Sequence, residues 1–364
     1  MTRSWLRWLP ALVVPAVIGA GIVIVPLMAN ATVSLPDKTP EQVLELVGEN
    51  SVTAFSGTVE QSSQLGLPEL PKGMASEASE LGAGGVEANA ASLIELLSGS
   101  HTARVYLDGA AKARVQVLDQ LAERDAIRNG SDVWLYDSAQ QTATHLTLPA
   151  QPSTGDAEGS VPTPGEVLTP AQVAERLLAA VDPSTTVSVG APVKVAGRTA
   201  YDLVLTPNSA NTLVGSVSVA VDSVTGMPLK VAVQARGQHQ PAFEIAFSEL
   251  TVQAPAAELF NFTPPPGATV KNVTVPAFQK GSTSAEGIPQ HTVTGSGWES
   301  ILTATVGVLP ASVTASPLFN ALTQSVPGGR AISTSLVTAL LTDDGRLFVG
   351  AVPLSQLQAA AATQ

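Results

Sequence analysis

The sequence contains few residues whose type and spacing would support catalysis or metal binding. Its four histidines are scattered, and none has a second histidine or a well-placed acid at the spacing of helical metal ligands; they are His101, His145, His239 and His291. There is no G-x-S-x-G, no phosphate loop ending in Gly-Lys-Ser/Thr and no H-E-x-x-H. The acids Asp343-Asp344 precede Gly345, which favours a turn over a cation site. We expect no catalytic residue, metal or cofactor. A hydrolase whose site lacks a known motif is the remaining enzymatic alternative.

Two aromatic residues are the clearest candidates for ligand contact. Trp134 and Tyr136 are one strand period apart, so both point to the same face of a strand. For each residue singly, packing in a core is the interpretation that we favour, and a place in the wall of an apolar pocket is the alternative.

Charge and cysteine content exclude several classes of function. The formal net charge is −12, so phosphate backbones would repel the chain and nucleic acid is not an expected partner. The same charge disfavours flat docking on an anionic bilayer. The absence of cysteine excludes disulfides, thiolate metal sites, a cysteine nucleophile and an N-terminal lipidated cysteine.

The N-terminus has the features of a membrane-directing segment. Arg3 and Arg7 precede a run without charge from Leu9 to Ala29, which is about long enough to span a bilayer. Ala29-Asn30-Ala31 fits a signal peptidase site. Residues 1–31 are thus either a cleaved signal peptide or a retained transmembrane anchor. In both cases the remainder is extracytoplasmic, in the cell envelope, and is either secreted or anchored.

Helix and turn signals organise the remainder. Thr39-Pro40-Glu41-Gln42 has an N-cap, a proline at the first helical position and a capping glutamine, and Thr169-Pro170-Ala171-Gln172 repeats this pattern. Between apolar runs, Asp108-Gly109, Asn129-Gly130 and Asp343-Asp344-Gly345 predict hairpins.

The second half predicts strands with one apolar face. Alternating residues share a face in three runs: Val217, Val219 and Val221; Leu229, Val231 and Val233; Phe243, Ile245 and Phe247. This pattern is typical of an antiparallel sheet with one buried face. Val219, Val231, Ile245 and Phe247, together with Trp134 and Tyr136, are our candidates for the wall of an apolar cavity.

Composition divides the chain. Residues 66–92 are rich in small residues and predict an insertion, and residues 149–166 predict a surface linker. We expect domains at 32–275 and 291–364, joined by a linker at 276–290.

Two stretches resemble a known superfamily. The first is Ala126-Ile127-Arg128-Asn129-Gly130-Ser131-Asp132-Val133-Trp134-Leu135-Tyr136-Asp137. The second runs from Gly197 through Val221-Asp222-Ser223-Val224-Thr225-Gly226-Met227-Pro228-Leu229 and ends at Phe260-Asn261-Phe262-Thr263-Pro264-Pro265-Pro266-Gly267-Ala268. These patterns resemble the outer-membrane lipoprotein carrier superfamily (LolA-type), whose relatives include RseB-type regulators of sigma factors. The resemblance covers roughly residues 37–275.

The resemblance implies an α+β, mainly antiparallel fold, in which a half-open β-barrel is covered on its concave side by helices. Residues 291–364 would add a small α/β unit. Carriers of this type have a Lys-Arg-Pro before the hairpin, whereas this chain has Asp108-Gly109-Ala110-Ala111-Lys112. The lid contact of the carriers is therefore not expected here.

Two non-enzymatic functions follow as hypotheses. The first is a carrier or binding protein that holds a lipid, a lipoprotein acyl chain or another apolar ligand in the concavity of the sheet. The alternative is an RseB-like envelope sensor or regulator that acts through a membrane protein partner bound by residues 291–364. An uncleaved N-terminal segment would add a contact with the membrane.

Overall fold

A computed structural model describes residues 34–66, 99–118, 123–148, 169–179, 183–274, 291–307, 309–315 and 317–363. The chain divides into two compact units, Met1–Pro36 and Asp37–Gln364. The predicted membrane-directing segment, both predicted linkers and all of the predicted insertion except Gly66 lie outside the described residues, and the domain boundaries stay predictions. Among the described helices, none is both long and apolar enough to cross a membrane.

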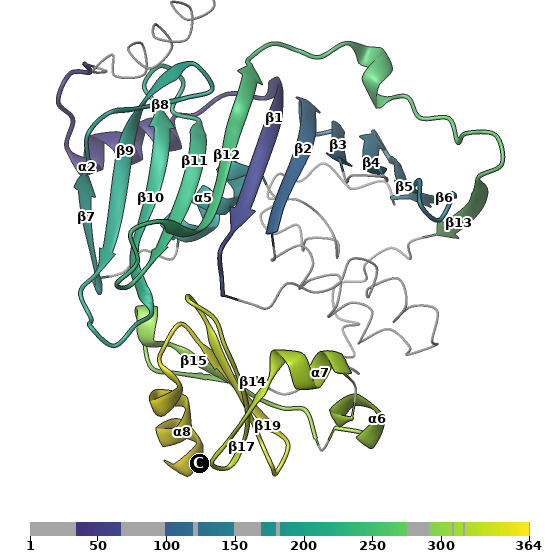
Figure 1. Cartoon of the computed structure of the whole chain (residues 1–364). Helices are drawn as coiled ribbons and strands as arrows, with labels where there is room; N and C mark the ends of the chain where they lie inside the picture. Colours follow the sequence, from purple (N-terminus) through teal and green to yellow (C-terminus); the bar gives the residue numbers. More distant parts are fainter. Residues whose placement is uncertain are drawn as a thin grey trace, which may run out of the picture. The chain divides into compact units, whose positions relative to one another are not determined.

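A large sheet of 13 strands forms most of the second unit (Figure 1). The main path runs in the order β13-β6-β5-β4-β3-β2-β1-β12-β11-β10-β9-β7, and β8 also pairs with β9. The strands are β1 Ala54–Ser63, β2 Gly99–Asp108, β3 Lys112–Leu118, β4 Glu123–Asn129, β5 Asp132–Asp137, β6 Thr142–Thr147, β7 Thr185–Val189, β8 Val193–Val195, β9 Arg198–Pro207, β10 Val214–Asp222, β11 Pro228–Ala235, β12 Pro241–Thr251 and β13 Thr269–Thr274.

The expected mainly antiparallel architecture is confirmed, and the described strands do not form a closed barrel. The path ends at β13 on one side and at β7 on the other. The sheet is also mixed, because β13 pairs with β6 in parallel. A parallel neighbour requires a long crossover connection, which a hairpin pattern cannot reveal.

Short hairpins build one half of the sheet. Asp108-Gly109 joins β2 to β3, and Asn129-Gly130 joins β4 to β5, as predicted. Gly109 and Gly130 have φ values of 67° and 66°, in the left-handed region that glycine adopts without steric cost.

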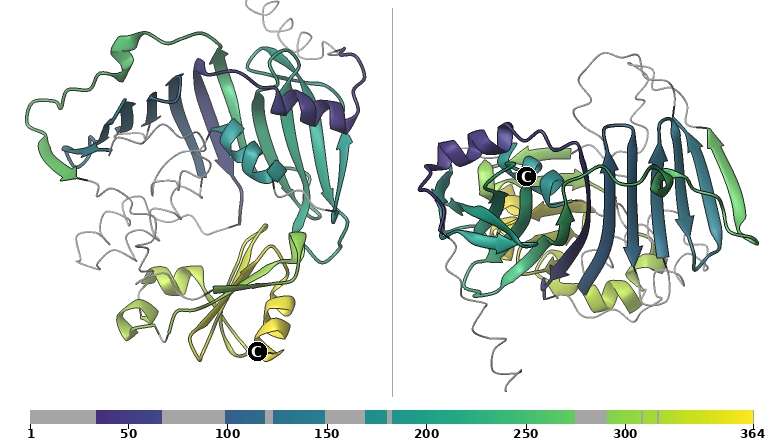
Figure 2. Two further views of the ribbon diagram at one scale, coloured as in Figure 1. Left: turned by 180° about the vertical axis from the view of Figure 1, so that it is seen from behind. Right: turned by 90° about the horizontal axis from the view of Figure 1, so that it is seen from above.

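The two predicted helices are present as α2 (Pro40–Gly48) and α5 (Pro170–Ala179). Thr39 forms the predicted capping box of α2: its Oγ1 accepts from Gln42 N at 3.4 Å, and Gln42 Oε1 accepts from Thr39 N at 2.9 Å. Both helices lie on the same side of the large sheet (Figure 2), and α5 packs on β11 and β12.

The connection from β12 to β13 crosses several strands. We call residues 252–268 the strap; it contains a short 3₁₀ helix, η3 (Ala257–Phe260), that contacts β3 and β4. Arg114 donates to the carbonyl oxygen of Leu259 at 3.1 Å, and Phe260 is fully buried. The strap leads from β12, in the middle of the sheet, to β13, which pairs with β6 at the far edge.

A second sheet has six antiparallel strands in the order β14-β15-β19-β18-β17-β16. The strands are β14 His291–Thr294, β15 Ile301–Thr305, β16 Gln324–Val326, β17 Gly329–Ser333, β18 Thr338–Thr342 and β19 Arg346–Gly350; the helices are η4 Gly297–Glu299, α6 Ala311–Thr314, α7 Pro317–Leu322 and α8 Leu354–Thr363. The predicted hairpin at Asp343-Asp344-Gly345 joins β18 to β19.

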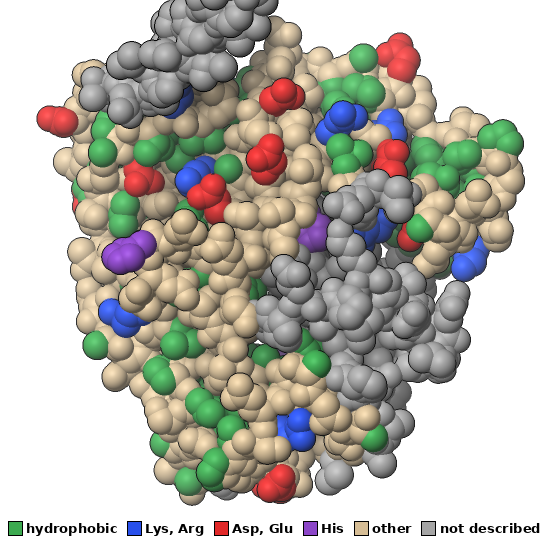
Figure 3. All heavy atoms as spheres, viewed as in Figure 1, with side chains coloured by type: hydrophobic (Ala, Val, Ile, Leu, Met, Phe, Trp, Pro, Cys, Tyr) green, Lys and Arg blue, Asp and Glu red, His purple; other side chains and the backbone are tan. Residues whose placement is uncertain are grey.

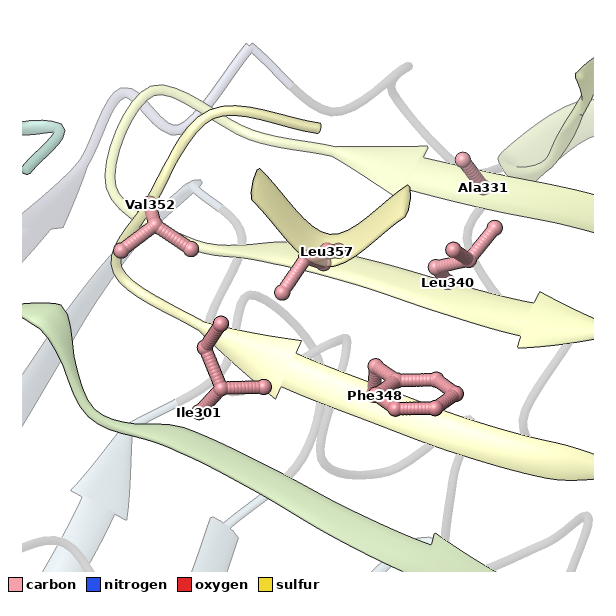
Figure 4. Close-up of a cluster of buried hydrophobic side chains, with 6 residues drawn as sticks. All are labelled: Ile301, Ala331, Leu340, Phe348, Val352 and Leu357. Carbon is pink, nitrogen blue, oxygen red and sulfur yellow. The ribbon is translucent and has the colours of Figure 1, made fainter. Parts of the chain in front are cut away.

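This small sheet has a hydrophobic core of its own. Leu357 of α8 packs on Phe348 and Leu340, and the core also contains Ile301, Ala331 and Val352 (Figure 4). The helix α8 therefore covers one face of the small sheet and buries its apolar side chains, which stabilises this sheet.

Candidate ligand-binding face

Strand register divides the six predicted wall residues between the two faces of the large sheet. Residues that pair directly across strands share a face. Val219 pairs with Val231, and Val231 pairs with Ile245, so these three form one row. Phe247 is two residues from Ile245 on the same face. We call this the helix-side face, because its apolar residues are buried in β9–β12, where α5 packs.

Trp134 and Tyr136 lie on the other face. Phe247 pairs with Val59, and the face of Val59 continues along β2, β3 and β4 to Ala126, which pairs with Leu135. Successive residues in a strand point to opposite faces. Leu135 therefore shares the face of Phe247, and its two aromatic neighbours do not. A cavity on one face is lined by at most four of the six candidates.

The four helix-side candidates are buried. Val219 and Val231 are 0% exposed, and Phe247 is 2% exposed. The ring of Phe247 packs edge-on against Phe55, with ring centroids 5.8 Å apart. These residues belong to the core beneath the helices.

Trp134 and Tyr136 pack against the strap. The ring of Phe262 lies 5.4 Å from that of Trp134 and 5.6 Å from that of Tyr136, and His145 stacks on Trp134 at 4.3 Å. His145 Nε2 is 2.9 Å from Asp132 Oδ1. We call the face that these residues occupy the strap-side face. Their surroundings match the packing interpretation of the pair.

The helix-side face of β3–β6 presents apolar side chains that are only half-buried. They are Val115, Val133, Leu135 and Leu146. Val105 and Val117 continue this surface toward β1 and are buried. These half-buried residues are the candidates for ligand contact on this face. The sequence does indicate two sets of side chains in β5, because Val133 and Leu135 alternate with Trp134 and Tyr136. Which set points to the helix-side face depends on the register of the strands.

Buried carboxyl groups of the large sheet have structural partners. Burial raises the pKa of Asp125, and the Arg114 guanidinium, whose Nη2 lies 2.5 Å from Asp125 Oδ2, opposes this shift. Burial also raises the pKa of Asp202, against the opposing charge of Lys230. Neither group lies among the half-buried apolar residues.

The motif around Asp222 closes the β10–β11 turn. Asp222 is 1% exposed, and its Oδ1 accepts from Val224 N at 2.8 Å and from Thr225 N at 3.3 Å. Its Oδ2 accepts from Arg198 Nε. This part of the resemblance is therefore a structural feature of the fold.

A hollow of about 270 Å³ lies over β12, β1 and β2. Most of its lining is polar: Glu60, Gln61, Ser62, Ser100, His101, Thr102, Glu244, Ala246, Phe247 and Ser248. In the described residues, no three His, Asp or Glu side chains are grouped so that they could hold a metal ion. Of the six predicted wall residues, Phe247 alone lines this hollow.

The small sheet carries a second apolar surface, on the face opposite α8. Pairing aligns one residue from each of five strands in a single row: Val293, Leu302, Val349, Ala339 and Ile332. Val293 is 60% exposed and Leu302 39% exposed. In the space-filling view, acidic and basic side chains gather mainly over the large sheet (Figure 3). We call the five residues the apolar row.

No family model and no curated protein matches this sequence. Solved structures do. MucB from Pseudomonas aeruginosa, in a complex with MucA, is 17% identical and covers 88% of this chain and 96% of its own, with a TM-score of 0.42.

The chain is thus similar in structure to MucB and to LolA superfamily proteins. A LolA superfamily protein from Nitrosomonas europaea is 12% identical and covers 62% of this chain and 99% of its own, with a TM-score of 0.22. An uncharacterised protein from Thermus thermophilus is 13% identical and covers 64% of this chain and 98% of its own, with a TM-score of 0.33. MucB is of the RseB type, so both groups named by the sequence resemblance are represented. With TM-scores below 0.5, these similarities place no ligand and no partner on this chain.

Proposed function

We propose that this chain is a non-enzymatic envelope sensor or regulator of the RseB type, with two binding surfaces. The helix-side face of the large sheet binds an apolar ligand, and the small sheet binds a membrane protein partner. The protein acts outside the cytoplasm, as its N-terminal sequence predicts.

The observation that carries the proposal is the apolar row. A single-sheet carrier has no need of a second sheet with its own core. Here α8 covers one face of that sheet, while the other face leaves Val293 and Leu302 exposed next to half-buried Val349. Contiguous exposed apolar side chains mark protein interaction surfaces. MucB was solved in a complex with MucA, and partner binding is proposed for this chain because of its own second sheet.

Crosslinking in cells that express the full chain tests this proposal. Leu302→Asp places a charge in the row between Val293 and Val349, so we expect loss of a membrane protein that crosslinks to the unmodified chain. Val224→Asp is the matched control, because Val224 is 79% exposed in the β10–β11 turn, away from the small sheet. Recovery of the same membrane protein with both variants would contradict the proposal.

The second candidate function is a carrier without a protein partner. The half-buried apolar side chains Val115, Val133 and Leu135 support ligand binding in either case. Native mass spectrometry of the purified chain, followed by solvent extraction, separates the candidates. Bound lipid without a crosslinked partner favours the carrier, whereas lipid and partner together favour the sensor.

A further inference from the structure

The charges of the large sheet are segregated by face. On the helix-side face of β1–β6 and β13, the charged residues are Arg124, Arg128, Lys271 and Asp137. The strap-side face of the same strands carries Glu60, Arg104, Asp108, Lys112, Arg114, Glu123, Asp125 and Asp132. The helix-side face is thus net positive and the strap-side face net negative, in a chain whose net charge is −12.

The two arginines flank the apolar surface. Arg124 and Arg128 lie on β4 on either side of Ala126, each about 7 Å from it along the strand. Ala126 belongs to the row that continues through Val115 and Leu135. A small side chain between two cations leaves space beside an otherwise apolar wall.

Arg128 is available to an anion. It is exposed, and its Nε donates to the carbonyl oxygen of Gly130 at 3.2 Å. Its two Nη groups have no hydrogen-bond acceptor among the described residues. Arg124 is half-buried and already has a partner, so it contributes mainly charge.

We propose that the ligand of the helix-side face is an acyl lipid with an anionic headgroup. Its chains lie on Val115, Val133 and Leu135, and Arg128, supported by the charge of Arg124, binds the headgroup. Guanidinium groups bind phosphate and carboxylate oxygens with paired, charge-assisted hydrogen bonds. This inference rests on the proposed binding of an apolar ligand to the same face, and adds which headgroup is selected.

The test compares two lipids that differ only in the headgroup. The purified full chain is incubated with dioleoyl phosphatidylglycerol or dioleoyl phosphatidylcholine, and bound lipid is measured by native mass spectrometry. We expect about tenfold tighter binding of the anionic lipid, because hydrogen bonds to charged groups are the stronger ones. Arg124→Gln with Arg128→Gln should reduce the preference to less than about twofold, and Arg128→Gln alone should reduce it in part.

Arg104→Gln is the matched control. Arg104 is also exposed on a strand of the same sheet, but it points to the strap-side face. Arg104→Gln removes the same charge as Arg128→Gln, but from the strap-side face, so the preference for the anionic lipid should remain. An equal loss in this variant would overturn the headgroup assignment, since net charge alone would then explain the preference. Equal binding of both lipids would overturn the assignment but leave the proposed function standing. Binding of neither lipid would overturn both.

Discussion

At the scale of single residues, burial and register decide what each side chain does. Asp202 lies in the middle of β9, where burial raises its pKa despite the charge of Lys230 and a hydrogen bond from Ser218. A raised pKa means that folding penalises the ionised form. The stability that Asp202 contributes is therefore fully present below its ordinary pKa of about 3.9 and is lost as pH rises through its higher value in the folded protein.

Asp202→Asn tests this assignment. Asparagine cannot ionise, so we expect a higher melting temperature than that of the unmodified chain at pH 7. The difference should disappear near pH 3, which is below the ordinary pKa of about 3.9. Thermal unfolding followed by circular dichroism across this range measures it.

Asp344→Asn provides a control of opposite sign. Hydrogen bonds from Thr342 and Arg346 lower the pKa of Asp344, so its stabilising contribution is present above the ordinary pKa and is lost as pH falls. This variant should melt at a lower temperature than the unmodified chain at pH 7. If Asp202→Asn also lowers the melting temperature at pH 7, attraction to Lys230 outweighs burial, and the assignment is wrong.

At the scale of elements, the β10–β11 turn positions the first helix. Gly226 in this turn has a φ of 73°, and a Cβ at that position would lie 1.9 Å from the carbonyl oxygen of Leu46 in α2. Gly226 of the sequence motif is therefore required by a close approach between helix and turn. A side chain there would force α2 away from the sheet.

Gly226→Ala should destabilise the protein by about 2–4 kcal/mol, because it combines an unfavourable φ with a backbone clash. Gly237→Ala is the matched control: Gly237 has a φ of 77°, but a Cβ added there would meet no atom within 4 Å. Its cost should be about 1 kcal/mol, from φ alone. Urea unfolding of both variants measures the difference, and equal costs would contradict the role of the contact with α2.

At the scale of the whole molecule, two sheets with separate cores are joined by hydrogen bonds. Leu213 N donates to the carbonyl oxygen of Ala351 at 2.8 Å, and Trp298 Nε1 donates to Thr185 Oγ1 at 2.8 Å. The core of the small sheet is centred on Phe348, which is 0% exposed. We therefore expect that disruption of the core of one sheet leaves the core of the other sheet packed.

Phe348→Ala should cost the small sheet about 3–5 kcal/mol, as expected for removal of a buried aromatic ring. Hydrogen exchange should become faster in β15 and β17–β19, while amides of β10 and β11 keep their protection. An equal loss of protection in β10 would show that the two sheets unfold together. Such a result would contradict separate cores.

The sequence by itself determined the local elements. The capping patterns at Thr39 and Thr169, the glycine turns at Gly109, Gly130 and Gly345, and the alternating strands of the second half all depend on interactions within a few residues. The superfamily resemblance also rests on such local motifs.

Only the tertiary structure decided which side of the sheet each strand residue faces. Trp134 and Tyr136 share a face, as their spacing predicted, but pairing through β4, β3, β2 and β1 places that face opposite Phe247. A shift of one residue exchanges the two faces, and strands that are distant in sequence set the register. The parallel pairing of β13 with β6 and the strap were hidden for the same reason, since both depend on contacts between residues more than a hundred positions apart along the chain.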